Sequence, residues 1–248
     1  MCRMMAIVGD VPVSRLDLLL KFRCLSVCGK VRGGLAPGHE DGWEILSYRD
    51  DSPEYIGRST DPAWKDAQYE VACRKVTNAD RIALAHIRKR SSGGNPKENT
   101  QPLVYGRWSL GHNGTIYTPS FNTVNGRSDS QVLLDRLVKR IEAGEPNMAE
   151  SLIAENLGRI RDDILREAKG GRAYSSLTLM VSDGRCLYVL RDFTDDADDD
   201  YYTMYYRRSS EGVVFCQERI LEGAWESLDN QELAIATHDG QVRRQRCD

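Results

Sequence analysis

The order of the expected secondary-structure elements is the feature that most constrains the fold of this chain. A first group of strand-like segments precedes two helices, and a second group follows them. Strands that came one by one between helices would favour a parallel α/β fold, whereas grouped strands favour an α+β fold with two antiparallel sheets and helical layers. No internal repeat or linker divides the chain, so we expect residues 2–248 to form a single domain.

Alternating or continuous apolar residues, bounded by turn residues, define the strands. They are Met4 to Val8, Trp43 to Tyr48, Arg81 to Ile87, Trp108 to Asn113, Leu177 to Val181, Cys186 to Arg191, Tyr202 to Tyr206, Val213 to Cys216 and Leu233 to Ala236. Helical spacing and capping residues predict helices over Ser14 to Cys24, Asp61 to Val76, Asp129 to Ala143 and Met148 to Lys169. Residues 89 to 103 are expected to form a long polar loop, and Asp195 to Asp200 a solvated hairpin tip.

Composition excludes several classes of function. The net charge is −3 and the basic residues are dispersed, so nothing indicates binding to nucleic acid. Neither a signal peptide nor an apolar stretch of membrane-spanning length is present, and the expected location is cytoplasmic, with no membrane partner.

The seven cysteines are odd in number and scattered, which argues against a disulfide framework. Cys24 and Cys28 could lie one helical turn apart, as a pair of metal ligands would. No second Cys or His pair completes four ligands, so we expect no metal site and interpret these thiols as small buried side chains.

Cys2 is the first candidate for chemistry. A thiol attacks well only beside a base or a positive charge. Removal of Met1 would leave Cys2 with a free α-amine, whose pKa of roughly 7.7–8.0 suits it to take the thiol proton near neutral pH. Nucleophile and base would then belong to one residue.

Polar residues at the ends of predicted elements complete a possible site. Arg88 follows a strand, and its guanidinium could bind a carboxylate through two hydrogen bonds. Asn113 and Gly114 end another strand, and a side-chain amide with a backbone N–H could stabilise an oxyanion. Asp129 opens a helix and could hold an ammonium group. Taken singly, these residues also fit a surface ion pair, a hairpin turn and a charge at a helix start.

Taken in order, these motifs resemble the class II glutamine amidotransferases. The resemblance is carried by Met1-Cys2-Arg3, Ala85-His86-Ile87-Arg88, Asn99-Thr100-Gln101-Pro102, His112-Asn113-Gly114 and Ser128-Asp129-Ser130. The short, stand-alone members are the most similar, including those like the γ-glutamyl hydrolase of ergothioneine biosynthesis. The resemblance implies a four-layer αββα sandwich of the N-terminal nucleophile hydrolase fold.

The resemblance also implies roles for individual residues. Cys2 would be the nucleophile and its own amine the base, while Asn113 and Gly114 would form the oxyanion hole. The substrate α-carboxylate would be bound by Arg88, with help from Ser91, and the α-amino group by Asp129. One departure from the pattern is Glu44, which follows Asp41-Gly42-Trp43 where stand-alone relatives often have a glycine. Others are Gln101, where relatives often have His, and Lys89-Arg90 in the substrate loop.

The expected activity is hydrolysis of the γ-amide of glutamine or a γ-glutamyl compound through a thioester on Cys2, without a cofactor. Two alternatives remain open at this point. The chain could be a glutaminase subunit that delivers ammonia to a separate synthase, or a non-catalytic regulatory domain that binds glutamine.

Overall fold

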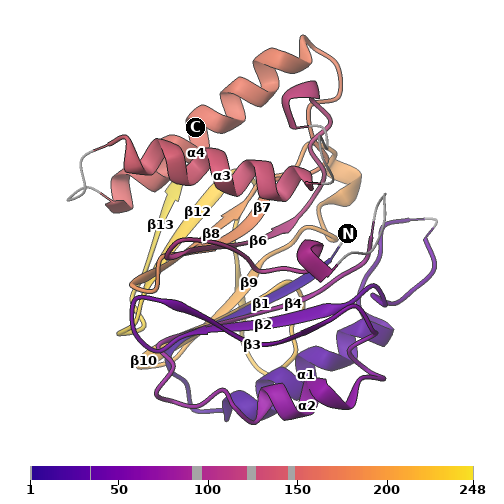
Figure 1. Cartoon of the computed structure of the whole chain (residues 1–248), viewed down its shortest axis with the longest axis vertical. Helices are drawn as coiled ribbons and strands as arrows, with labels where there is room; N and C mark the ends of the chain where they lie inside the picture. The colour runs from indigo at the N-terminus through magenta and orange to yellow at the C-terminus, as the bar shows by residue number, and fades with distance from the viewer. Residues whose placement is uncertain (1, 34, 91–96, 122–126, 145–148, 248) are drawn as a thin grey trace.

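Two antiparallel sheets lie face to face and are covered by helices on their outer faces in the computed structural model of the chain (Figure 1). The structure describes residues 2–33, 35–90, 97–121, 127–144 and 149–247. The expected α+β class and the αββα layering of N-terminal nucleophile hydrolases are confirmed.

The first sheet contains seven strands in the order β11-β9-β10-β1-β4-β2-β3. Their bounds are β1 Arg3–Asp10, β2 Trp43–Tyr48, β3 Pro53–Ser59, β4 Ile82–Ile87, β9 Tyr205–Arg208, β10 Glu211–Cys216 and β11 Glu226–Ser227. The N-terminal strand β1 lies in the middle, with Met5 opposite Cys216 on one side and Ala85 on the other. The start of the chain is therefore held in the interior.

The second sheet contains six strands in the order β13-β12-β8-β7-β6-β5. Their bounds are β5 Leu103–Tyr105, β6 Trp108–Asn113, β7 Thr178–Ser182, β8 Cys186–Arg191, β12 Glu232–Thr237 and β13 Val242–Arg246. Strand β6 faces the start of β1, because a Cβ added to Gly111 would come within 3.2 Å of the Met4 sulfur. This contact brings the end of β6 close to Cys2.

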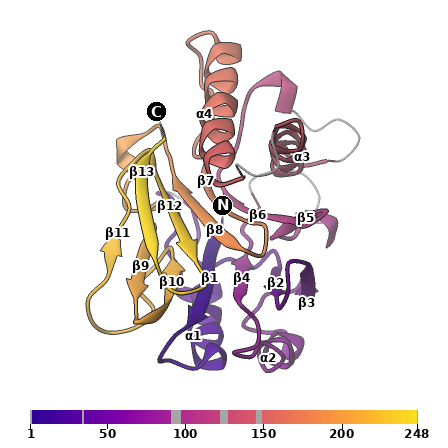
Figure 2. The same cartoon turned by 90° about the vertical axis from the view of Figure 1, so that its left-hand side faces the viewer.

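The helices form the two outer layers. Helices α1, Arg15–Cys28, and α2, Ala67–Cys73, cover the first sheet, while α3, Asp129–Glu142, and α4, Ala149–Ala168, cover the second (Figure 2). Short 3-10 helices are η1 Lys97–Asn99, η2 Pro119–Phe121 and η4 Asp196–Asp198. Ser14 caps α1, and Ser128 caps α3 in a capping box with Gln131, as their sequence positions predicted.

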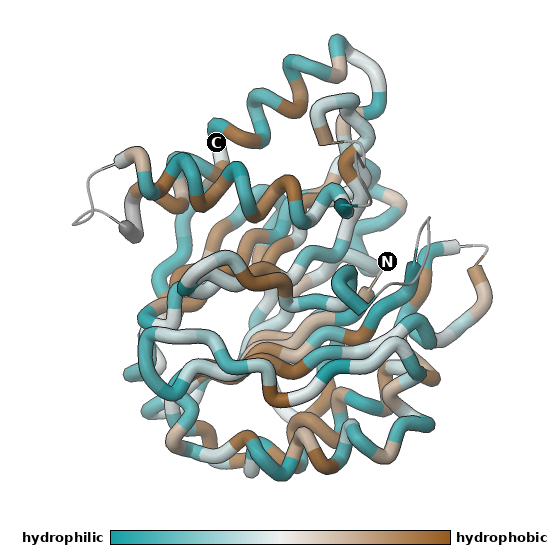
Figure 3. The backbone as a smooth tube through the Cα atoms, in the orientation of Figure 1, coloured by the Kyte–Doolittle hydropathy of each residue, from teal (hydrophilic) through white to brown (hydrophobic). Residues whose placement is uncertain are grey.

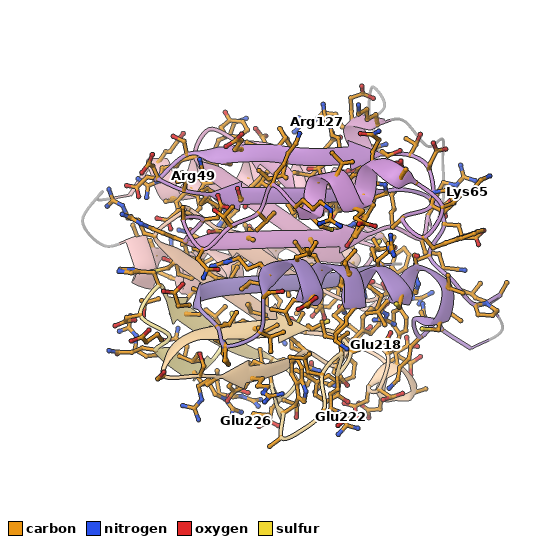
Figure 4. All side chains as sticks on the ribbon, turned by 90° about the horizontal axis from the view of Figure 1, so that it is seen from below. Arg49, Lys65, Arg127, Glu218, Glu222 and Glu226 are labelled. Carbon is orange, nitrogen blue, oxygen red and sulfur yellow. The ribbon has the colours of Figure 1, made fainter. Side chains whose placement is uncertain are left out.

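Apolar side chains fill three layers of core, one between the sheets and one beneath each helical layer. The backbone coloured by hydropathy shows hydrophobic positions along the strands of the two sheets (Figure 3). Met4, Ala6 and Val8 point into the space between the sheets, whereas Met5 and Ile7 point toward α1 and α2. Charged side chains such as Arg49, Lys65 and Glu222 surround the face that carries α1 and α2 (Figure 4). In the described part of the chain, no helix combines the length and apolar character needed to cross a membrane.

Several sequence predictions need correction at their boundaries. The helix expected from Asp61 begins only at Ala67, because Pro62 to Asp66 form a turn and the Asp66 side chain accepts a hydrogen bond from Gln68 N. Strand β3 was missed since it is an edge strand with half-exposed residues and an interior Gly57. Strand β9 starts at Tyr205 rather than Tyr202, whose N–H closes a turn onto Asp198 O.

Two further interpretations were wrong. Asp195 to Asp200 do not form a hairpin tip, because β8 and β9 on either side belong to different sheets. Part of this segment pairs with cations, through Asp198 with Arg32 and Asp200 with Lys30. Cys24 and Cys28 are exposed on α1 rather than buried.

Candidate active site

Cys2 lies immediately before β1, in the first sheet, and faces the end of β6 in the second. Its backbone nitrogen donates a hydrogen bond to Asn113 Oδ1 at 2.9 Å, and both residues are buried. The chain start therefore lies between the two sheets (Figure 1). The structure brings together two of the residues singled out in the sequence, one from each sheet.

The Asn113 side chain is oriented from both ends. While its oxygen accepts from Cys2, its Nδ2 donates to Gln217 Oε1 at 3.1 Å. Gln217 directly follows β10, is fully buried, and donates its own N–H to Met4 O. Sequence reasoning missed Gln217, although a polar residue at the end of a buried strand was the signal that identified the others.

Gly114 occupies a place that admits no side chain. A Cβ there would lie 1.9 Å from Ser176 O and 2.6 Å from His112 Nε2. The His112 ring is itself fixed, with Nδ1 2.9 Å from Ser130 Oγ and Nε2 3.0 Å from Ser176 O. The backbone can follow Asn113 into this position only as glycine.

Arg88 follows β4 and is half-buried near Cys2. Its backbone is held on both sides, with N donating to Gly42 O at 2.9 Å and O accepting from Asp41 N at 3.0 Å. Burial lowers the pKa of the Arg88 guanidinium, while the charges of Cys2 and Asp41 act in the opposite direction. Arg88 and Cys2 thus interact electrostatically.

Asp129 is the first residue of α3 and is half-buried. Its Oδ2 accepts from Ile116 N and its Oδ1 from Ser130 N, each at 2.9 Å. The carboxylate therefore fixes the chain just beyond Asn113-Gly114 to the start of α3. Ser91, the remaining residue implied by the resemblance, lies outside the described residues.

The electrostatic surroundings of Cys2 favour a thiolate. Burial opposes ionisation, but the positive charges of the amino terminus, here the amine of Met1, and of His86 outweigh it and lower the pKa of the Cys2 thiol to about 5. The sulfur also lies 3.9 Å from Lys89 O. The lowered thiol pKa favours the thiolate, the form in which sulfur attacks a carbonyl carbon.

Arg3 fixes the start of the chain. Its buried guanidinium donates to Tyr201 O at 3.1 Å, pairs with Glu218 Oε1 at 2.9 Å and lies 4.2 Å from the centre of the Tyr201 ring. Tyr201 in turn directs its hydroxyl toward Cys2 O at 3.5 Å. These contacts hold the backbone on either side of the nucleophile.

The geometry combines a buried thiol with hydrogen-bond donors and the Arg88 guanidinium, which is suited to attack on an amide or ester carbonyl. Among the described residues, no group of three His, Cys, Asp or Glu side chains could hold a metal ion.

Comparisons with known proteins identify the family that the chain matches. The sequence model of the family described as "Glutamine amidotransferases class-II" matches residues 1–210. An uncharacterized protein of Methanocaldococcus jannaschii is 24% identical over 227 residues, which cover 79% of this chain. The chain spans 61% of the length of that relative.

Three solved structures share the fold. A glutamine aminotransferase class-II domain protein from Silicibacter pomeroyi aligns over the whole of both chains, with a TM-score of 0.64 and 19% identity. A predicted glutamine amidotransferase from Pseudomonas aeruginosa has a TM-score of 0.59 and 16% identity, covering 97% of this chain and 99% of its own. Glutamine phosphoribosylpyrophosphate amidotransferase from B. subtilis has a TM-score of 0.61 and 15% identity, covering 100% of this chain and 49% of its own.

Proposed function

Because this chain belongs to the class-II glutamine amidotransferases, we propose that it hydrolyses the γ-amide of glutamine or of a γ-glutamyl compound, with Cys2 as the nucleophile. The observation that carries the proposal is the 2.9 Å hydrogen bond from the Cys2 nitrogen to Asn113 Oδ1. It brings the nitrogen that would become the α-amine, the thiol and the amide of Asn113 to one place.

The chemistry would begin once Met1 has been removed. The α-amine of Cys2 takes the thiol proton, and the thiolate attacks the γ-carbonyl carbon of the substrate. The resulting oxyanion is bound by Asn113 Nδ2 and the N–H of Gly114. The amine then passes its proton to the leaving ammonia or amine as the C–N bond breaks, and water hydrolyses the γ-glutamyl thioester to glutamate.

Asn113 can orient the amine and bind the oxyanion at the same time. A carboxamide has one oxygen and an NH₂ group with two donors. The oxygen accepts from Cys2 N, and one of the two donors is directed to Gln217 Oε1. The second N–H is the one we assign to the oxyanion.

The amino-acid end of the substrate would be bound by charges of opposite sign. Arg88 is proposed to bind the α-carboxylate, with help from Ser91, and Asp129 to bind the α-ammonium group. One cation and one anion match the head group that glutamine shares with every γ-glutamyl compound.

The reaction is proposed to be hydrolysis without transfer of ammonia to a partner. Met1-Cys2-Arg3 at the chain start resembles the γ-glutamyl hydrolases of ergothioneine biosynthesis, and we propose that residues 2–248 act as a single domain. Ammonia release from glutamine by the purified chain would support this reaction. Release that required a second protein would instead indicate a glutaminase subunit serving a synthase.

A glutamine-like diazoketone tests the proposal directly. It should label Cys2, located by peptide mapping, and the Cys2→Ala variant should be neither labelled nor active. Intact mass would first establish that Met1 is absent from the active protein. Labelling of another cysteine, or glutamine binding without any turnover, would overturn the hydrolase and favour a regulatory domain.

A further inference from the structure

Two ionisable side chains lie between the sheets, one near Cys2 and the other one strand further away, and have no part in the mechanism above. In the strand register, Glu44 on β2 lies opposite His86 on β4, and His86 lies opposite Met4 on β1. Along these strands Leu46, Leu84 and Met4 point into the core between the sheets, so Glu44 and His86 point there too. Each is only 1% exposed.

The contacts of Glu44 indicate that its carboxyl group is protonated. Thr100 Oγ1 lies 2.6 Å from Glu44 Oε2 and 2.7 Å from Lys97 O. A hydroxyl has one proton to donate, and a backbone carbonyl can only accept. Both contacts are satisfied when Glu44 donates to Thr100 and Thr100 donates to Lys97 O. In agreement, burial raises the pKa of Glu44 to about 8, against the opposing influence of Thr100, Arg58 and Lys97.

His86 lies between Glu44 and the nucleophile. Cys2 is two residues from Met4, the partner of His86, and is therefore a diagonal neighbour of His86 on the same face of the sheet. Diagonal neighbours are within reach of a long or aromatic side chain. Among the described residues, no hydrogen bond of normal geometry reaches either ring nitrogen of His86 or Glu44 Oε1, although His86 lies close enough to the Cys2 thiol to lower its pKa. Burial of such unpaired polar atoms lowers the stability of the fold unless they form hydrogen bonds with one another or with the thiolate.

We propose that His86 holds the Cys2 thiolate electrostatically and that Glu44, in its protonated form, orients the His86 ring from the neighbouring strand. The α-amine of Cys2 remains the base, as in the proposed function on which this inference rests. Glu44 Oε1 can accept from one His86 N–H, which directs the other toward the sulfur. An ionised Glu44 would pair with His86 and cancel the charge that the thiolate needs, so the neutral carboxyl suits this role.

Other ionisable groups also face this pair. Arg58 and Tyr55 on β3 and Lys97 interact with Glu44, while Arg88 and Tyr201 interact with Cys2. All of them remain unchanged in the variants below. Differences between those variants therefore report on His86 and Glu44.

The test is the pH dependence of alkylation of Cys2 by iodoacetamide in the full chain, resolved from the other thiols by peptide mass spectrometry. Since only the thiolate reacts, the midpoint of the rate profile reports its ionisation. His86→Gln should raise this midpoint by at least about one pH unit, the shift expected on losing a nearby opposite charge. His238→Gln, the same substitution at an exposed position, should leave it unchanged.

Two substitutions of Glu44 distinguish a role of its neutral carboxyl group from a role of its carboxylate. Glu44→Gln has the shape of the protonated acid and should keep the wild-type midpoint, whereas Glu44→Ala should raise it. An unaltered midpoint in a folded His86→Gln protein would overturn the role of His86. Equal shifts in Glu44→Gln and Glu44→Ala would overturn that of Glu44.

A measurement on the wild-type protein covers the case in which His86→Gln fails to fold. Alkylation of Cys2 should change the NMR signals of the His86 ring and leave those of His238 in place, and unchanged His86 signals would count against the proposal. Neither readout requires turnover. Loss of glutamine hydrolysis with these results intact would therefore reject the proposed function alone.

Discussion

The nitrogen of Cys2 and the side-chain oxygen of Asn113 are 2.9 Å apart although 111 residues separate them in the chain. Cys2 precedes the central strand of one sheet, and Asn113 ends a strand of the other. The bond therefore exists only when the two sheets are packed correctly. It makes the geometry of the candidate site a direct consequence of the tertiary fold.

Asn113→Asp tests the donor role assigned to this amide. The substitution keeps an oxygen acceptor for Cys2 N but removes both N–H donors. Loss of one oxyanion donor typically reduces kcat about 10²–10³-fold. We expect a reduction of that size in glutamine hydrolysis, with continued reaction of Cys2 with iodoacetamide. Steady-state kinetics with both assays would check it, and near-normal kcat would show that Asn113 does not bind the oxyanion.

Gly114→Ala should destabilise the protein as well as inactivate it. The new Cβ would meet a backbone oxygen at 1.9 Å, so the segment after β6 must move. Overpacking of this kind costs roughly 1–3 kcal/mol, and a backbone clash lies at the upper end. Thermal unfolding should show a clearly lower Tm. Gly33→Ala is the matched control, because a Cβ there would meet no atom within 4 Å. Equal Tm values for the two variants would contradict the clash.

The sequence predicted the α+β class and the strand ends and helix starts on which the candidate site residues lie, because both depend on local signals. Strand ends, such as Asn113, and helix starts, such as Asp129, are marked by residues whose capping and turn chemistry acts over a few positions. The position of Ser128 before α3 is one such signal, and the structure shows Ser128 as the cap of that helix.

The residues that sequence reasoning missed depend on contacts across the fold. Gln217 reaches the candidate site through Asn113, which lies in the other sheet. Arg3 becomes buried only because Tyr201 and Glu218 surround it. Glu44 was noted as a departure from the family pattern, but its neighbours His86 and Thr100 come from elements more than forty residues away. The periodicity of a single segment carries no information about neighbours that come from distant parts of the chain.

Arg88→Lys should weaken recognition of the substrate α-carboxylate. Lysine keeps the charge but cannot form two parallel hydrogen bonds with a carboxylate. We expect kcat/KM for glutamine to fall about 10–100-fold, a loss of about 1.4–2.7 kcal/mol, mostly through KM. The wild-type enzyme should discriminate strongly against glutaminamide, whose carboxylate is replaced by an amide, and the variant should discriminate much less.

Arg90→Lys is the matched control for that substitution, because Arg90 lies 3.9 Å from Asp41 at the edge of the substrate loop. It should alter kcat/KM for glutamine and glutaminamide by the same small factor. If Arg88→Lys left the preference for the carboxylate intact, another cation would have to bind it.

The buried carboxyl of Glu44 should make stability fall as the pH rises. Burial raises its pKa from 4.5 to about 8 in the folded protein, so the folded state keeps a proton that the unfolded chain loses. The contribution is therefore fully present below pH 4.5, is lost between about pH 4.5 and 8, and changes no further above that. Within this window the slope is about 1.4 kcal/mol per pH unit at most.

Glu44→Gln cannot ionise, so its stability relative to wild type should increase across the same window. Urea unfolding of both proteins from pH 5 to 9 measures the difference and cancels the other titrating groups. A difference that stays constant with pH would mean that Glu44 ionises normally in the folded state.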